Sequence, residues 1–210
     1  MHFSISLPAA ASLLLFTAAC QTPPGKDTAQ AGPPPVTAAG LSALPRCATG
    51  ASARLADGIP VGYLGSDPDD PQRCLVEWSD RSHPLYFGFW SPSPKRPISE
   101  PAREAFSAAL TGPVGTEASF EDEGAQMWSR VTVTHVANSV VDVAGQQRPA
   151  LELRVVRHDA LGRADVRAET RYSIDRATGV LLRSESVTPM ADGQVSTTTG
   201  WRIGSLDEAG

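Results

Sequence analysis

No stretch of this sequence is apolar for long enough to cross a membrane as a helix, and lysine is almost missing. Residues 7–19 are all apolar or small, but a membrane-spanning helix needs about 20 apolar residues. Lys26 and Lys95 are the only lysines, and the formal net charge of the 210 residues is −5. This mild acidity argues against the basic surface of a nucleic-acid-binding protein, so we predict no nucleic-acid partner.

The sequence also lacks the compact motifs of the common enzyme classes. It contains no Gly-x-Ser-x-Gly elbow, no His-Glu-x-x-His, no Walker loop and no Ser-x-x-Lys. His83 lies in a predicted loop and could act as a base, but an isolated loop histidine is more often a surface residue. The pattern predicts that His135 is a partly buried structural residue and that His158 is exposed. We therefore predict no catalytic residue, no cofactor and a non-enzymatic protein.

A cysteine directly follows the apolar stretch. Residues 7–19 have the length of a signal-peptide core, and Thr17, Ala18 and Ala19 are small residues suited to a cleavage site. With Cys20 next, this order resembles the signal peptide and lipobox of bacterial lipoproteins. The resemblance implies that Cys20 becomes the lipidated first residue of a protein held in the cell envelope. An ordinary cleavage site followed by a cysteine is the alternative.

The lipoprotein resemblance also predicts where the protein is attached. In enterobacterial lipoproteins a residue other than Asp after the lipidated cysteine directs the protein to the outer membrane, and Gln21 fits that pattern. The expected location is therefore the outer membrane, facing the periplasm, with the membrane contacted through the N-terminal lipid.

The composition and length of the chain predict a division into four segments. Residues 1–19 form the signal peptide, and residues 20–45 are rich in proline, alanine and glycine but poor in large apolar side chains. Such a segment buries too little surface to offset its chain entropy, so we predict a disordered spacer. Residues 46–206 have the length of a single β-rich domain, and residues 207–210 are a short tail.

Two cysteines lie within the predicted domain, Cys47 and Cys74. In the oxidising periplasm such a pair is most simply a structural disulfide. A redox or metal-binding pair is the alternative, but there is no Cys-x-x-Cys spacing and no histidine nearby in the sequence. We therefore predict a disulfide and no metal site.

Strand and turn signals dominate the predicted domain. Segments rich in β-branched and aromatic residues predict strands, and glycine- or aspartate-containing turns separate them. The predicted strands are 59–64, 73–79, 85–90, 126–136, 139–144, 149–157, 163–175, 180–188 and 194–203. One helix is predicted at 100–110, after a capping Ser99 and before Gly112. The fold class is thus mainly β, an antiparallel meander with one short helix.

Strand 163–175 alternates strictly between charged and apolar positions, which predicts one solvated and one packed face. The solvated face includes Asp175 and is expected to pair with charged residues of neighbouring strands. They are Glu152, Arg154, Arg183 and Glu185. The strand-turn pattern of residues 126–203, with Val140-Val141-Asp142-Val143-Ala144-Gly145 and Asp175-Arg176-Ala177-Thr178-Gly179, resembles periplasmic β-proteins. It is also loosely similar to the curved half-barrel of periplasmic lipoprotein carriers. These resemblances imply a curved sheet and no catalytic residues.

Clustered acids and tryptophans are the remaining candidates for a site. Asp67, Asp69 and Asp70 offer oxygen ligands for Ca²⁺, but they lack the Gly and distal Glu of an EF-hand loop, and a solvated turn is favoured. Residues 121–124 are likewise predicted to be a solvated loop. The tryptophans are expected to be core or sheet-face anchors, or to line an apolar pocket if the sheet is hollow. They are Trp78, Trp90, Trp128 and Trp201.

These observations favour a lipid-anchored envelope lipoprotein with a non-enzymatic structural or interaction role, whose partner is an envelope protein. The first alternative is a periplasmic binder or carrier of a lipid or another apolar ligand. The second is a hydrolase whose site is assembled from scattered residues. A cavity inside the sheet would favour the carrier, and a filled core would oppose it.

Overall fold

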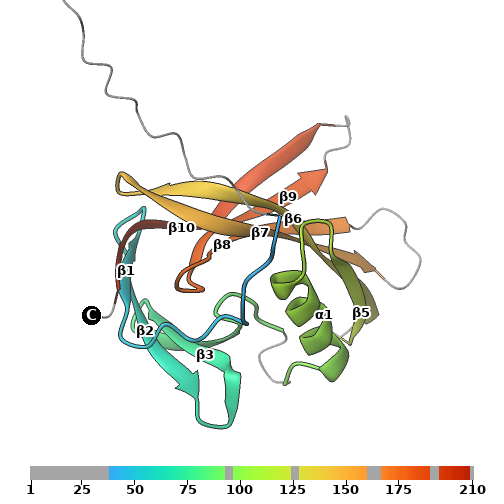
Figure 1. Ribbon diagram of the computed structural model, residues 1–210, viewed down its shortest axis with the longest axis horizontal. Coiled ribbons are helices and arrows are strands. Elements are labelled where there is room, and N and C mark those ends of the chain that lie inside the picture. The colour runs from blue at the N-terminus through green and yellow to red at the C-terminus, as the bar shows by residue number, and fades with distance from the viewer. Residues whose placement is uncertain (1–37, 93–96, 124–127, 160–166, 190–193, 209–210) are drawn as a thin grey trace, which may run out of the picture. The chain divides into compact units, whose positions relative to one another are not determined.

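The computed structural model describes residues 38–92, 97–123, 128–159, 167–189 and 194–208, and within them it contains one antiparallel sheet and one helix (Figure 1). The predicted mainly β meander is confirmed. The strands are β1 (Ser52–Leu55), β2 (Pro60–Asp67), β3 (Asp70–Trp78), β4 (Arg81–Tyr86), β5 (Glu117–Glu123), β6 (Trp128–Val143), β7 (Gln146–Asp159), β8 (Arg167–Asp175), β9 (Leu181–Pro189) and β10 (Val195–Asp207). The helix is α1 (Glu100–Thr111).

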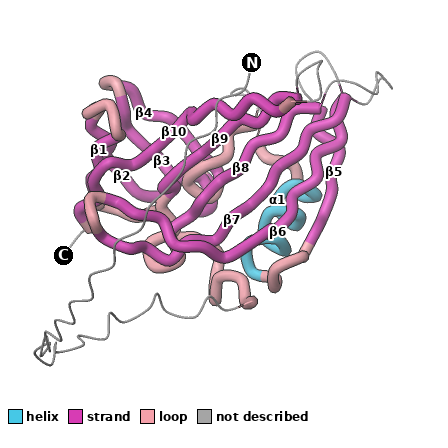
Figure 2. The backbone as a smooth tube through the Cα atoms, turned by 90° about the horizontal axis from the view of Figure 1, so that it is seen from above, coloured by secondary structure: helices cyan, strands magenta, loops and turns pink. Residues whose placement is uncertain are grey.

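The strand order shows how the sheet is assembled. It runs β4-β3-β2-β1-β10-β9-β8-β7-β6-β5, so every neighbouring pair but one is consecutive in the chain. The exception is β1, which pairs with the last strand, β10. The two edge strands, β4 and β5, are consecutive in sequence and are connected through α1. The sheet does not close, and α1 lies on its inner face near β5 (Figures 1 and 2).

The structure corrects the strand and loop predictions at several places. The predicted strands 126–136 and 139–144 are one strand, β6, which passes through a register shift between His135 and Ala137. The predicted loop at residues 121–124 is wrong for its first three residues, which belong to β5. Strand β1 was not predicted, because four residues carry too little alternation to be recognised.

The predicted strand 85–90 is also only partly correct. Strand β4 ends at Tyr86, and the chain then turns back so that the Trp90 amide donates to the Tyr86 carbonyl at 2.9 Å. Phe87 adopts a φ of 55°, which a strand cannot accommodate. The turn places large aromatic side chains on the inner face of the sheet, where Phe87, Phe89 and Trp90 are buried.

The predicted helix is confirmed, including its ends. The Ser99 hydroxyl accepts from the Ala102 amide, and the Gly112 amide donates to the Ala108 carbonyl. Its apolar stripe faces the sheet and is buried; it consists of Ala102, Ala105, Phe106, Ala109 and Leu110. Among the described residues, no helix combines the length and apolar content required to cross a bilayer.

The larger hydrophobic core lies between α1 and the sheet. Phe106 is fully buried, and its ring centroid lies 4.8 Å from Trp90 of the turn after β4 and 6.0 Å from Phe120 of β5. Trp90 and Phe120 also meet edge to face at 5.9 Å. Phe106 therefore contacts both edge regions of the open sheet through its packing against Trp90 and Phe120.

A segment preceding β1 is fixed to the domain by backbone bonds. The Leu41 amide donates to Leu110 of α1, and the Val114 amide donates to Ala38. Gly40 passes so close to the end of α1 that a Cβ atom would lie 2.4 Å from the Gly112 carbonyl oxygen. The folded part therefore includes residues 38–45, which the sequence assigned to the spacer.

Candidate functional site

The predicted disulfide between Cys47 and Cys74 is present, with the two Cα atoms 5.2 Å apart. It joins the segment before β1 to strand β3 across 27 residues of sequence. Cys20, the predicted lipidation site, lies outside the described residues.

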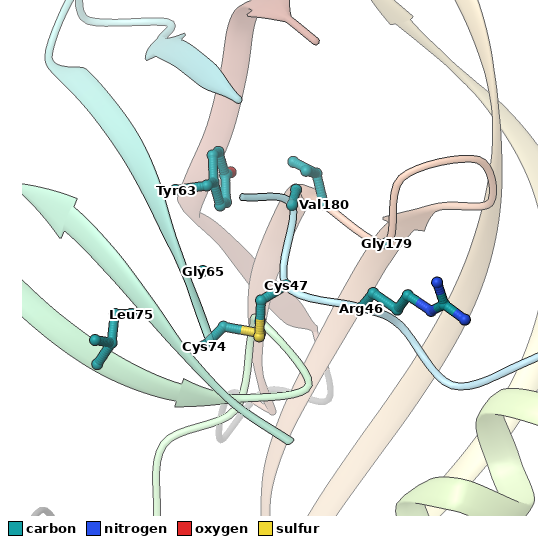
Figure 3. Close-up of a pocket in the computed structure, with 10 residues that line it drawn as sticks. Arg46, Cys47, Tyr63, Gly65, Cys74, Leu75, Gly179 and Val180 are labelled. Carbon is teal, nitrogen blue, oxygen red and sulfur yellow. A yellow bond between two sulfur atoms is a disulfide. The ribbon is translucent and has the colours of Figure 1, made fainter. Parts of the chain in front are cut away.

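A small pocket lies beside the disulfide (Figure 3). Its volume is about 10 Å³, close to the smallest space that holds one water molecule. Tyr63 and Val180 line it next to the disulfide, whereas the side chain of Arg46 is directed away. Burial raises the pKa of the Tyr63 phenol, so this hydroxyl stays protonated at neutral pH. The pocket is too small for an organic ligand.

The acidic segment between β2 and β3 binds arginines. Strands β2 and β3 leave only Pro68 and Asp69 as a turn, so the predicted loop is much shorter than expected. Asp67 pairs with Arg73 at 2.7 Å, and Asp70 pairs with Arg103 of α1. The interpretation as a wholly solvated turn is thus wrong for Asp67 and Asp70, whose side chains are both 14% exposed. Across the described residues, no group of three or more acidic, histidine or cysteine side chains is placed to hold a metal ion.

The Asp70–Arg103 pair connects the sheet to the helix. Two guanidinium nitrogens of Arg103 donate to the two carboxylate oxygens of Asp70. The backbone amide of Gln72 also donates to Oδ1 of Asp70, at 3.1 Å. The guanidinium carbon of Arg103 lies 5.4 Å from the centroid of the Tyr86 ring. The hydrogen bonds from Arg103 hold the pKa of Asp70 below its ordinary value of 3.8.

Replacing Asp70 by asparagine is expected to lower the free energy of unfolding by about 1–3 kcal/mol at pH 7, since a charged hydrogen-bonded pair is lost. A lowered folded-state pKa stabilises the fold above the unfolded value of 3.8, and this contribution disappears as pH falls through the folded-state pKa. The difference between wild type and variant should therefore shrink below pH 3.8 in urea titrations. Asp69→Asn, at an exposed position, is the control and should change stability by less than about 0.5 kcal/mol. A pH-independent difference would contradict this account.

The three histidines of the described residues do not form a common site. His83 lies on β4, so its predicted place in a loop is wrong; it stacks on Trp78, with the ring centroids 3.5 Å apart. His135 is fully buried, and its ring nitrogens lie 2.9 Å from the Gly112 carbonyl oxygen and 3.1 Å from Oδ1 of Asn138. His158 is exposed on β7, as predicted. The structural role expected for His135 is confirmed, although its burial is complete and not partial.

A polar cluster at the turn between β8 and β9 was not predicted. Asp175 is fully buried, and its Oδ2 atom accepts from Arg148 at 2.8 Å and from the Thr178 hydroxyl at 2.5 Å. The expectation that Asp175 lies on the solvated face of its strand is therefore wrong. Arg148 and Thr178 cover its carboxylate, and at this end of β8 the pairing with β9 shifts register, with Leu182 as the extra residue of β9. Along the same strand Arg171 remains exposed and lies opposite Glu185 of β9, as expected. It also lies opposite Arg154 of β7, so the expected pairing of opposite charges is wrong for Arg154.

The same turn holds the segment before β1. Arg176 donates to the carbonyl oxygens of Ala39 and Gly40 at 3.0 and 2.7 Å. Gly179 has a φ of 75°, and a Cβ atom there would lie 2.7 Å from Cβ of Pro45. The Asp-x-x-Thr-Gly turn thus fixes the segment before β1. Local sequence patterns could not predict the contacts of Arg176, because they span 137 and 136 residues. Glu208, in the predicted tail, also pairs with Arg148.

An open groove lies where β10 meets the end of β1. Its volume is about 290 Å³, and it is lined by Leu55, Ala56, Asp57, Thr199, Gly200, Trp201 and Arg202. Trp201 contacts Trp78 edge to face at 5.4 Å, and its ring N–H donates to the Leu181 carbonyl at 2.9 Å. The expected anchoring role is thus confirmed for Trp201 and for the buried Trp90, whereas the side chain of Trp128 lies outside the described part.

No protein-family model, no curated protein and no solved structure matches this chain. The function is therefore argued from the residues and their arrangement.

Proposed function

We propose that this protein is a lipoprotein of the bacterial cell envelope, anchored through Cys20, whose β-domain acts by binding a partner on its outer surface. The anchor rests on the order of apolar segment, small residues and cysteine in residues 7–20. The outer membrane is the proposed location, because Gln21 follows the cysteine.

The aromatic packing of the described residues on the inner face of the sheet is the observation that carries the interaction role. A carrier of apolar ligands needs a cavity of some hundreds of Å³ lined by apolar side chains. Here Phe106, Trp90 and Phe120 occupy the space between α1 and the two edge regions, and the pocket beside the disulfide is about 10 Å³. This packing favours contacts on the outside of the domain over carriage within it.

The contacts of residues 38–41 suit a tethered domain. The carbonyl oxygens of Ala38, Ala39 and Gly40 accept hydrogen bonds from three different parts of the chain. The donors are the Val114 backbone amide, the Asn138 side-chain amide and the Arg176 guanidinium. A pull transmitted along the spacer would therefore act on the whole domain and would not peel away a single strand.

Membrane fractionation of cells producing the full chain tests the proposal. Wild-type protein is expected in the membrane fraction after a high-salt and carbonate wash, and Cys20→Ser is expected to be soluble. The double variant Cys47→Ala, Cys74→Ala is the control, since it alters the other cysteines and should remain membrane-bound. A Cys20→Ser protein that stays in the membrane would contradict the anchor. A free lipid bound to the soluble Cys20→Ser protein, detected by solvent extraction, would favour the carrier instead.

A further inference from the structure

In the part of the chain that the structure describes, one side of β10 has no neighbouring strand over residues 195–200. The other side of β10 pairs with β9, from Val195 opposite Pro189 to Arg202 opposite Arg183, with a register shift between Thr199 and Trp201. Strand β1 pairs with β10 only between Ile203 and Asp207, and a last backbone bond joins the Ala56 amide to Arg202. Within the described residues, no strand lies opposite residues 195–200, and all six are exposed. Their backbone groups on that side are available to another strand.

The free part of β10 lacks the residues that normally protect an edge. The two terminal edges of the sheet carry such residues: β4 has Arg81 and Pro84, and β5 has Glu117, Glu121, Asp122 and Glu123. Charges and proline at an edge discourage pairing with another strand. Residues 195–200 read Val-Ser-Thr-Thr-Thr-Gly, with no charge and no proline, and Val and Thr favour strands. This edge is thus suited to strand addition.

We infer that residues 195–199 of β10 pair antiparallel with the same residues of a second copy, forming a two-fold symmetric dimer with a continuous sheet. The inference rests on the proposed membrane anchor, which confines the copies to one surface. The symmetry axis passes at Thr197, which faces its own copy, so uncharged residues face each other and no like charges meet.

The two ends of this edge are complementary in the proposed dimer. Antiparallel pairing about Thr197 brings Val195 of one copy opposite Thr199 of the other, next to Gly200. Val195 is apolar and 60% exposed, and the 290 Å³ groove beside Gly200 is lined in part by Leu55 and Ala56. The two-fold axis places both valines at both grooves at once. An exposed apolar side chain and an open groove are thereby covered together.

The membrane anchor explains how such a short interface can form. Five residue pairs bury less surface than the roughly 1,200–2,000 Å² of a stable interface, so the dimer is weak in free solution. Two copies anchored in one membrane have a raised effective concentration, which favours their pairing without new contacts.

Cysteine crosslinking of the full chain in membranes tests the dimer. The single variants Thr197→Cys, Thr198→Cys and Thr199→Cys are made in turn, because residues that face their own copies across the axis lie within disulfide reach. At least one is expected to give a reducible crosslinked dimer after mild oxidation. Ser186→Cys is the control: Ser186 is exposed and pairs with Thr198, but its strand β9 has neighbours on both sides. Its crosslinked fraction should be at least tenfold lower.

A second substitution separates pairing from chance collision. Ser196→Lys, added to the best crosslinking variant, places a charge on the edge and is expected to reduce the crosslinked fraction at least fivefold, whereas added Ser186→Lys should change it less than twofold. Equal crosslinking of edge and control cysteines, no crosslink from any edge cysteine, or a crosslink to a different protein would overturn the dimer. Membrane fractionation of the same samples reports on the anchor independently, so an anchored protein without crosslinks contradicts the dimer alone.

Discussion

Phe106→Ala is expected to lower the free energy of unfolding by about 4 kcal/mol, the cost of removing a fully buried aromatic side chain. The ring of Phe106 contacts Phe87, Phe89 and Trp90 from the turn after β4, and Phe120 from β5. Those groups come from opposite edges of an open sheet, so the cavity cannot close by the movement of one neighbour. Urea denaturation followed by tryptophan fluorescence measures the loss.

Glu104→Ala is the matched control for this helix position. Glu104 lies on the exposed side of α1, two residues before Phe106, so its truncation should change stability by less than about 0.5 kcal/mol. If Phe106→Ala cost less than about 1.5 kcal/mol, the filled inner face would be loosely packed, and the argument against a ligand cavity would fail.

Asp175→Asn is expected to cost about 3 kcal/mol, because it removes one partner of a buried ion pair. The Asp175 side chain is 1% exposed and that of Arg148 11%, so water compensates little for the lost charge. The same carboxylate accepts from the backbone amide and hydroxyl of Thr178, which hold the turn between β8 and β9. Thermal and urea unfolding of the variant measure the loss.

Glu208→Gln serves as its control, since it alters the exposed partner of the same arginine. Glu208 is 53% exposed in its pair with Arg148, so its replacement should cost no more than about 1 kcal/mol. An equal loss in the free energy of unfolding for Asp175→Asn and Glu208→Gln would contradict the larger stabilisation assigned to the buried Asp175 carboxylate.

Local sequence patterns predicted the elements that are determined by interactions between residues close in sequence. The alternation in residues 163–175 identified β8, and the Ser99 cap and Gly112 identified α1 within one residue of its observed end. The pairing of Cys47 with Cys74 followed from an even pair in an oxidising compartment. Each of these inferences depends on residues close in sequence or on a count of residue type.

The parts that were missed depend on residues far apart in the chain. Residues 121–123 looked like a solvated acidic loop, yet they form an edge strand because β6 offers a partner for pairing. Asp70 looked solvated because its partner, Arg103, lies 33 residues away on α1. The free edge of β10 could not be predicted either, since it arises where β1 stops pairing at Ile203.

The proposed role combines these features in one arrangement. In the proposal, a lipid on Cys20 anchors the domain to a membrane. In the structure, Arg176 holds Ala39 and Gly40, and aromatic side chains pack on the inner face. The uncharged edge at residues 195–200 then offers an outward surface for a second copy. Binding at the membrane surface is the activity that this arrangement suits.

The mass of the mature protein tests the membrane anchor most directly. Full-length protein extracted from membranes with detergent should begin at Cys20 and carry a thioether-linked diacylglycerol, usually with an N-acyl chain, as intact-mass and N-terminal peptide spectra would show. A mature chain that begins elsewhere, or that begins at an unmodified Cys20, would contradict the anchor and with it the proposed role.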